Sequence, residues 1–195
     1  MVNANRLWHK QGVMQPRSGH RPRPALDLAS LNELALSYVG RFATSRAKLT
    51  TYLARKLRER GWAGDAEPDP AAVADRLAQL GYVDDAAFAI AKARALTGRG
   101  LGGRRVGAAL YAAGIEEEDG NDARAYAHDG RVEAALRMAR RRRIGPFAEA
   151  ILDPVQREKA IGAMLRAGHG IALSKAIVAL PPGHRIDHSY LEELR

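Results

Sequence analysis

The feature that most constrains the fold of this chain is a helix stop signal that recurs at an almost constant interval. The segments "RERGW", "YAAGI" and "RAGHG" each end an amphipathic pattern at a glycine, and Gly61, Gly114 and Gly168 are separated by 53 and 54 residues. A fixed period with the same stop signal is typical of tandem supersecondary units. Four and eight positions before these glycines lie Leu57 and Leu53, Leu110 and Val106, and Met164 and Ala160.

The hydrophobic spacing between the stops is helical. In the first unit the pattern i, i+3, i+4, i+7 predicts a buried stripe, and no segment alternates in the manner of a strand. The stripe consists of Leu31, Leu34, Ala35, Tyr38 and Phe42. The sequence therefore predicts an all-α fold with three tandem three-helix units. Their ranges are 29–82, 83–128 and 129–180, with a disordered basic arm at 1–28 and a tail at 181–195.

The paired aspartates in "LGYVDDAAFA" are interpreted as helix punctuation and not as an acid–base pair. Gly81 is expected to end one helix in the left-handed conformation, and Asp84 to cap the next by accepting a backbone N–H. Asp85 falls in the first turn, where the positive end of the helix dipole favours a carboxylate. No histidine or third acid lies nearby in the sequence, so a catalytic role is not expected.

The charge of the chain indicates polyanionic partners. The formal net charge is +9 and the pI is about 10.2, which favours nucleic acid. The charge is banded: residues 1–60 carry 12 Lys and Arg against 3 Asp and Glu, residues 61–130 carry 7 against 12, and residues 131–195 carry 12 against 7. The cations at both ends predict two contact regions separated by an acidic middle.

Other classes of protein are disfavoured by what the sequence lacks. The chain has no cysteine, which excludes disulfides and thiolate zinc sites, and no apolar run reaches the roughly 18 residues of a membrane span. The N-terminal segment has no hydrophobic signal core, so we expect a cytoplasmic protein. His184 and His188 are four positions apart but follow a Pro-Pro-Gly break, and no nucleophile–base pair is visible. The sequence predicts a non-enzyme without cofactor or metal.

Three segments carry a resemblance to a known family. They are "SRAKLTTYLARKLRERGW" at 45–62, "LGYVDDAAFA" at 80–89 and "RGLGGRRVGAALYAAGI" at 99–115. Over about residues 31–180 the chain resembles the RecX regulators of the RecA recombinase. The resemblance implies an elongated, curved monomer that binds the RecA–single-stranded DNA filament and inhibits its recombinase and ATPase activities, with a role in DNA repair and the SOS response. His169 departs from the family pattern, because an aromatic or aliphatic residue is expected there.

Clustered Lys and Arg side chains are the candidate contacts to nucleic acid or filament. "GRGLGG" at 98–103 follows a helix instead of a strand, so a dinucleotide site is not expected; a solvated turn and a phosphate contact both stay open. Four consecutive arginines at 140–143 exceed what a helix C-terminus needs, which favours a binding role. The candidates are Arg46, Lys48, Arg55, Lys56, Arg58, Arg60, Arg99, Arg104, Arg105, Arg137, Arg140, Arg141, Arg142 and Arg143.

Two alternatives to filament regulation stay open at the level of sequence. Three-helix units resemble helix-turn-helix modules, so direct binding to duplex DNA is one alternative. The arginine clusters lack the accompanying Asn and Gln side chains that read base edges, and this counts mildly against it. An RNA-binding adaptor is the other alternative, because the N-terminal segment is basic.

Overall fold

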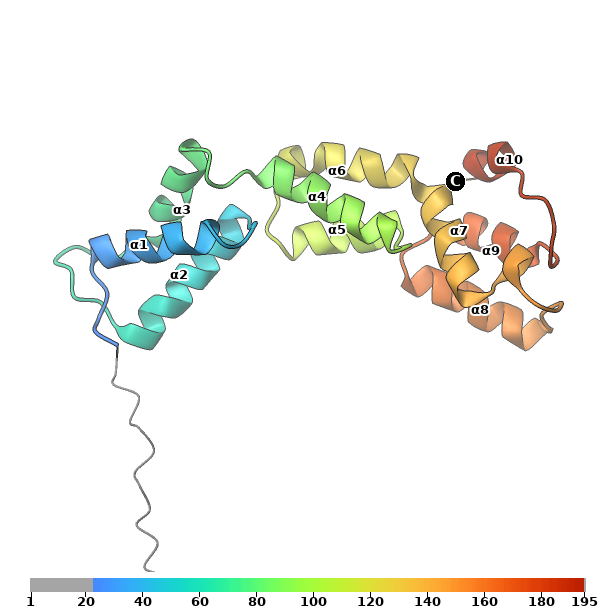
Figure 1. Ribbon diagram of the computed structural model, residues 1–195, viewed down its shortest axis with the longest axis horizontal. Coiled ribbons are helices and arrows are strands. Elements are labelled where there is room, and N and C mark those ends of the chain that lie inside the picture. Colours follow the sequence, from blue (N-terminus) through green and yellow to red (C-terminus); the bar gives the residue numbers. More distant parts are fainter. Residues whose placement is uncertain (1–22, 195) are drawn as a thin grey trace, which may run out of the picture.

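The computed structural model describes residues 23–194, and all of its regular secondary structure is helical (Figure 1). The all-α prediction is therefore confirmed. Figure 1 shows an elongated molecule in which the helices follow one another along the long axis. The helices are α1 (Leu28–Val39), α2 (Arg46–Arg60), α3 (Pro70–Gln79), α4 (Asp85–Gly98), α5 (Gly103–Tyr111), α6 (Glu117–Asp129), α7 (Arg131–Arg142), α8 (Pro154–Arg166), α9 (Ile171–Ala179) and α10 (His188–Glu193), with a short 3-10 turn, η1 (Gly145–Phe147), after α7.

Buried apolar side chains form three separate clusters, one for each successive group of three helices. Each group thus buries its own small core, and an elongated molecule results because no single core gathers all the helices. The clusters include Leu31, Leu53 and Leu77 in α1–α3, Ala93, Leu110 and Ala123 in α4–α6, and Val132, Met164 and Ile177 in α7–α9.

The ends of the helices follow the capping rules that the sequence indicates. Gly61, Gly114 and Gly168 all have positive φ, at 79°, 66° and 94°, the region in which a glycine avoids the Cβ clash of other residues. Asp84 caps α4 by accepting the N–H of Ala87 at 2.8 Å. The recurring stop signal and the capping role of Asp84 are therefore confirmed.

The helix α6 forms although its sequence, "EEDGNDARAYAHD", is a poor helix former. Three acidic side chains fill its first turn, where the helix dipole stabilises them. Gly120 is buried within α6, and buried alanines on α4 and α6 belong to the second cluster. Small residues allow close helix packing, which offsets the roughly 1 kcal/mol that a helical glycine costs relative to alanine.

The N-terminal boundary of the fold lies earlier than the sequence predicts. Leu26 is fully buried; its N–H donates to the carbonyl of Gly61 at 3.0 Å, and its carbonyl accepts from Ala63 at 2.8 Å. Asp27 then caps α1 by accepting the N–H of Ser30 at 2.8 Å. The predicted arm therefore ends too late at residue 28. The remainder of that prediction, residues 1–22, lies outside the described residues.

The predicted C-terminal tail contains α10, whose Leu191 is 1% exposed and belongs to the third cluster. The predicted burial of Phe42 on the stripe of the first unit is wrong, because its side chain is 54% exposed. Phe42 follows the end of α1 at Val39, so the helical period that predicted its burial no longer applies.

Candidate nucleic-acid interface

The second helix of each group lies along the same edge of the molecule in Figure 1, and the start of one meets the end of the next. Before α2, the Ser45 hydroxyl donates to the carbonyl of Ala113, just beyond α5, at 2.5 Å. Before α5, the N–H of Gly102 donates to the carbonyl of Ala167, just beyond α8, at 2.9 Å. We call these contacts the first joint and the second joint. The two joints lie at equivalent helix ends, but the donor is a side-chain hydroxyl in the first and a backbone N–H in the second.

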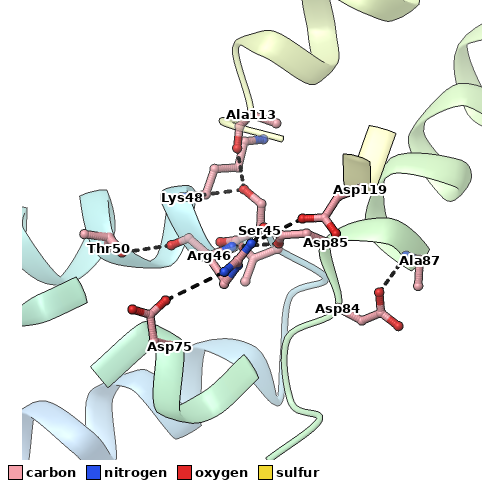
Figure 2. Close-up of polar contacts among 11 residues, drawn as sticks. Ser45, Arg46, Lys48, Thr50, Asp75, Asp84, Asp85, Ala87, Ala113 and Asp119 are labelled. Carbon is pink, nitrogen blue, oxygen red and sulfur yellow. Dashed lines mark hydrogen bonds and ion pairs between the residues drawn. The ribbon is translucent and has the colours of Figure 1, made fainter. Parts of the chain in front are cut away.

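An arginine at the first joint is surrounded by carboxylates (Figure 2). The backbone N–H of Arg46 donates to Asp85 at 2.9 Å and its Nε donates to the other oxygen of the same carboxylate at 3.1 Å. Its guanidinium also donates to Asp119 at 3.2 Å and lies 3.9 Å from Asp75. These acids come from α3, α4 and α6, so one side chain links the first group of helices to the second.

The ion cluster changes the interpretation of two sequence motifs. The hydrogen bond that Arg46 donates to Asp85 raises the pKa of Arg46, so the guanidinium stays charged. Arg46 was predicted to contact nucleic acid, but its charge is engaged within the chain, and we remove it from the candidate interface. Asp85 lies in the first turn of α4 as expected, yet its side chain is only 4% exposed and holds an arginine. The paired aspartates therefore divide into a cap and an ion-pair acceptor.

The second joint is a backbone-to-backbone contact that only glycine permits. A Cβ on Gly102 would lie 2.5 Å from the carbonyl carbon of Gly168, and a Cβ on Gly168 would lie 2.6 Å from the amide nitrogen of Arg105. Neither distance is compatible with a carbon side chain. The "GRGLGG" segment therefore contains a packed joint at Gly102, whereas Arg99 and Gly103 are exposed. The phosphate contact that the sequence suggests for this turn stays a prediction.

His169 completes the second joint from the side of the third group. Its Nε2 lies 3.1 Å from the carbonyl of Gly100, and its own carbonyl accepts from Arg104 Nη2 at 2.6 Å. The imidazole is buried, and burial lowers the pKa of His169 despite the hydrogen bond to Gly100; the charge of Arg104 lowers it further. The residue is therefore neutral and structural near pH 7, which explains why a histidine occupies an expected apolar position.

A groove lined by four arginines lies where α5, α7 and α8 meet. It has a volume of about 240 Å³ and is lined by Arg105, Arg141, Arg142 and Arg166. Arg141 Nη1 also donates to the carbonyl of Arg99 at 2.7 Å, which fixes its position. Within residues 23–194 no carboxylate is within ion-pairing distance of the four guanidinium groups. A concave surface with several cations and no nearby acid attracts phosphate groups. We call it the arginine groove.

The run of four arginines at 140–143 is divided by the fold. Arg140 lies with its guanidinium carbon 4.9 Å from the centroid of the Phe147 ring. Arg143 ends α7 in the left-handed conformation and pairs with Glu149. The two outer residues of the run thus have partners within the chain, and the two inner ones line the arginine groove.

The candidate cations on α2 form a second basic surface, at the other end of the molecule. Lys56 and Arg55 share Glu59, at 2.6 Å and 3.6 Å, and Arg60 Nε donates to the carbonyl of Pro24 at 2.9 Å. The α2 surface is thus partly neutralised, whereas the arginine groove is not.

Three candidates are left: Lys48 and Arg58, which also lie on α2, and Arg137, which lies on α7. Lys48 Nζ lies 5.2 Å from the centroid of the Phe88 ring. Arg58 is exposed near the end of α2, and Arg137 lines a separate cavity of about 330 Å³ next to α10. The predicted set is therefore dispersed, and the structure brings only part of it together.

Two residues at these sites were not singled out from the sequence for the roles they take. Arg166 lies near the end of α8, where a lone cation resembles ordinary capping of a helix C-terminus. Asp85 was assigned only to the helix dipole. The long-range partners of both residues are 24 or more positions away in the sequence, and no local pattern points to them.

Two features typical of other classes of protein are absent from the described residues. Among the described residues no cluster of three or more His, Cys, Asp and Glu side chains is arranged to hold a metal ion. No helix within residues 23–194 combines the length and apolarity needed to cross a membrane.

Two solved structures of known proteins share the fold of this chain. The crystal structure of RecX from Lactobacillus salivarius superposes with a TM-score of 0.59 at 18% sequence identity, and the match covers 77% of this chain and 93% of that one. A second crystal structure, of regulatory protein RecX, gives a TM-score of 0.56 at 19% identity and covers 77% of this chain and 70% of that one. At these identities the likeness shows a shared all-helical fold.

A sequence relative then supports the particular family. The regulatory protein RecX of Myxococcus xanthus (strain DK1622) is 28% identical over 174 residues, which cover 85% of this chain and 92% of the relative. No family model matches the chain. The resemblance to the RecX family that the motifs carry is confirmed by this homologue and by the structural neighbours.

Proposed function

We propose that this chain is a non-catalytic regulator that binds a RecA–single-stranded DNA filament and inhibits its recombinase and ATPase activities. The observation that carries the proposal is the arginine groove: four guanidinium groups with no acidic partner among residues 23–194, on an elongated helical scaffold that resembles RecX. We further propose that the protein acts as a monomer in the cytoplasm and needs no cofactor.

The scaffold in this proposal is three tandem units in an elongated, curved arrangement. The units are α1–α3, α4–α6 and α7–α10, which correspond to the predicted ranges 29–82, 83–128 and 129–180 extended at both ends. Three separate apolar clusters support this division, as does the equivalence of the two joints. Tandem units of this kind place binding residues at intervals along an extended surface, which suits a filament.

The arginine groove is assigned to the sugar–phosphate backbone of the DNA. Guanidinium groups match phosphate through paired N–H donors, and their contacts carry little sequence information. A protein that binds any stretch of a single strand needs contacts of this kind. The groove lies between the second and third units, so its shape depends on the second joint.

The direct test is the ATPase activity of RecA on single-stranded DNA, measured while the concentration of this protein is raised. We expect inhibition at or below equimolar protein, because a bound regulator blocks turnover within the filament. Unchanged ATP hydrolysis at equimolar protein would contradict the proposed function. Negative-stain images of the same filaments would show whether the protein lines the groove or sits at the ends.

The role of the arginine groove is tested by the double substitution Arg142→Gln and Arg166→Gln. Each lost phosphate contact should reduce the salt dependence of single-strand affinity by about 0.7 in log–log slope. Arg185→Gln is the matched control, since Arg185 is exposed outside the groove. An unchanged slope in the double variant, with the same slope in the control, would exclude the groove as the phosphate contact.

A further inference from the structure

An aromatic side chain that the fold leaves on the surface begins a ladder of three rings in the first group of helices. Phe42 is 54% exposed, and its ring centroid lies 5.3 Å from that of Tyr38 at an interplanar angle of 47°. Tyr38 in turn stacks on Tyr52, with centroids 4.2 Å apart and an angle of 22°. We call Phe42, Tyr38 and Tyr52 the aromatic ladder.

The inner part of the aromatic ladder is fixed in place. Tyr38 and Tyr52 are partly buried against the first apolar cluster, and the N–H of Phe42 donates to the carbonyl of Tyr38 at 3.0 Å. The outermost ring is thus held against a rigid stack. A large apolar ring that the core does not use, held in a defined orientation, is suited to bind another flat ring.

Cations lie at both ends of the ladder. The Arg55 guanidinium carbon lies 5.6 Å and Lys56 Nζ lies 5.8 Å from the centroid of the Tyr52 ring. Arg41, next to Phe42, donates only to uncharged groups of Ser37, so its charge is not neutralised by that contact. The acid paired to Arg55 and Lys56 is the single Glu59. Three cations and one acid leave the surroundings of the ladder positive.

We propose that the aromatic ladder is a stacking platform for an unpaired base of single-stranded nucleic acid, with the phosphates next to that base held by Arg41, Arg55 and Lys56. Proteins that bind single strands combine a cationic surface with aromatic rings on which bases stack. A purely apolar partner would make a favourable contact with Phe42 but none with the cations, so the positive charge favours a polyanionic partner. This inference rests on the proposed function and adds a second contact with the strand, at the opposite end of the molecule from the arginine groove.

The test compares two strands that differ only in their bases: a dT oligonucleotide and an abasic backbone of the same length, each bound to the full chain. The wild-type protein should bind the dT strand more tightly, because only that strand has bases to stack. Phe42→Ala should lose roughly 5- to 150-fold affinity for the dT strand, as expected for one stacked base, and little for the abasic strand.

Three further variants keep the test decisive. Phe42→Leu retains an apolar contact with Tyr38 but has no aromatic face, so it should behave as Phe42→Ala, whereas Phe42→Trp should retain the preference for dT. Tyr111→Ala is the matched control, because Tyr111 is 87% exposed and stacks on no other ring among the described residues.

Three results would overturn the platform. They are equal binding of both strands by the wild type, a loss below twofold in both Phe42→Ala and Phe42→Leu, and a loss confined to the filament with RecA present, which would mean that the ladder contacts protein. The RecA ATPase measurement is independent of all three. Inhibition that persists in Phe42→Ala leaves the proposed function intact, while a wild type without inhibition rejects that function whatever the ladder binds.

Discussion

The two joints of this molecule occupy equivalent positions and each packs a glycine closely, but the groups around that contact differ. The first joint is polar: a serine hydroxyl and an arginine meet a carbonyl and three carboxylates. The second joint is steric: two glycine backbones touch where no side chain fits, beside a buried histidine. Beyond it, a single residue, Gly130, separates α6 from α7.

The difference indicates which part of the molecule is adjustable. Ion-pair energy changes slowly with distance, so charged groups tolerate small shifts and respond to salt. Repulsion between backbone atoms rises steeply, so the glycine contact permits one arrangement only. We expect the first group of helices to reorient on a fixed body formed by the other two.

The second joint should be broken most severely by Gly102→Ala. The new Cβ would overlap the carbonyl of Gly168, and overpacking of this kind costs about 1–3 kcal/mol or more of unfolding free energy. Urea denaturation measures the loss. Gly103→Ala is the matched control, because a Cβ there meets nothing within 4 Å, and it should be neutral or slightly stabilising. Equal stability of the two variants would contradict the steric description of this joint.

The first joint should be loosened by Arg46→Ala. Removing one partner of a buried pair costs about 3–5 kcal/mol, but 36% of the Arg46 side chain is exposed, so we expect a smaller loss of about 2 kcal/mol. X-ray scattering should also show a broader distribution of overall dimensions, which Gly103→Ala should not produce. Scattering that matches the wild type would mean that Arg46 does not set the arrangement of the first group.

Salt should separate the joints further. The Debye length falls from about 10 Å at 0.1 M salt to about 3 Å at 1 M, which weakens the partly exposed pairs of Arg46. We expect the stability difference between wild type and Arg46→Ala to shrink by about 1 kcal/mol over this range. The difference between wild type and Gly102→Ala should stay constant, and a parallel decline in both would argue against an ionic first joint.

A small pH effect should belong to the second joint. The pKa of His169 is lowered in the folded state from the ordinary value of 6.5. Below pH 6.5 the unfolded chain therefore binds a proton at this residue that the folded chain does not, and the stability should fall as the pH decreases through that window. Urea denaturation at several pH values measures it. His169→Gln keeps an amide donor for Gly100 and should remove this contribution; an unaltered pH dependence would show that His169 titrates normally.

Much of the fold was predictable because its signals are local. The helix stops depend on glycine conformation and the caps on side chains three residues from their donors, so Gly61, Gly114, Gly168 and Asp84 were read correctly. Burial was predicted less well at helix ends. Phe42 continues the numerical pattern of α1 but lies beyond its last turn, and Leu26 is buried by pairing with residues 35 and 37 positions away.

The candidate site was less predictable because its charges are sorted by long-range contacts. From the sequence alone, Arg46 and Arg142 are equivalent cations on amphipathic helices. The structure places Arg46 against three carboxylates and Arg142 in a groove that no carboxylate of residues 23–194 lines.

The helices and their ends could be predicted from the sequence, since each follows from interactions within a few residues along the chain, and the positive charge follows from the composition. The tertiary structure alone decided which charges stay available and what holds the units together. Pairing of charges and contact between backbones depend on distances in space between segments 39 to 73 residues apart, and no property of a single segment encodes them.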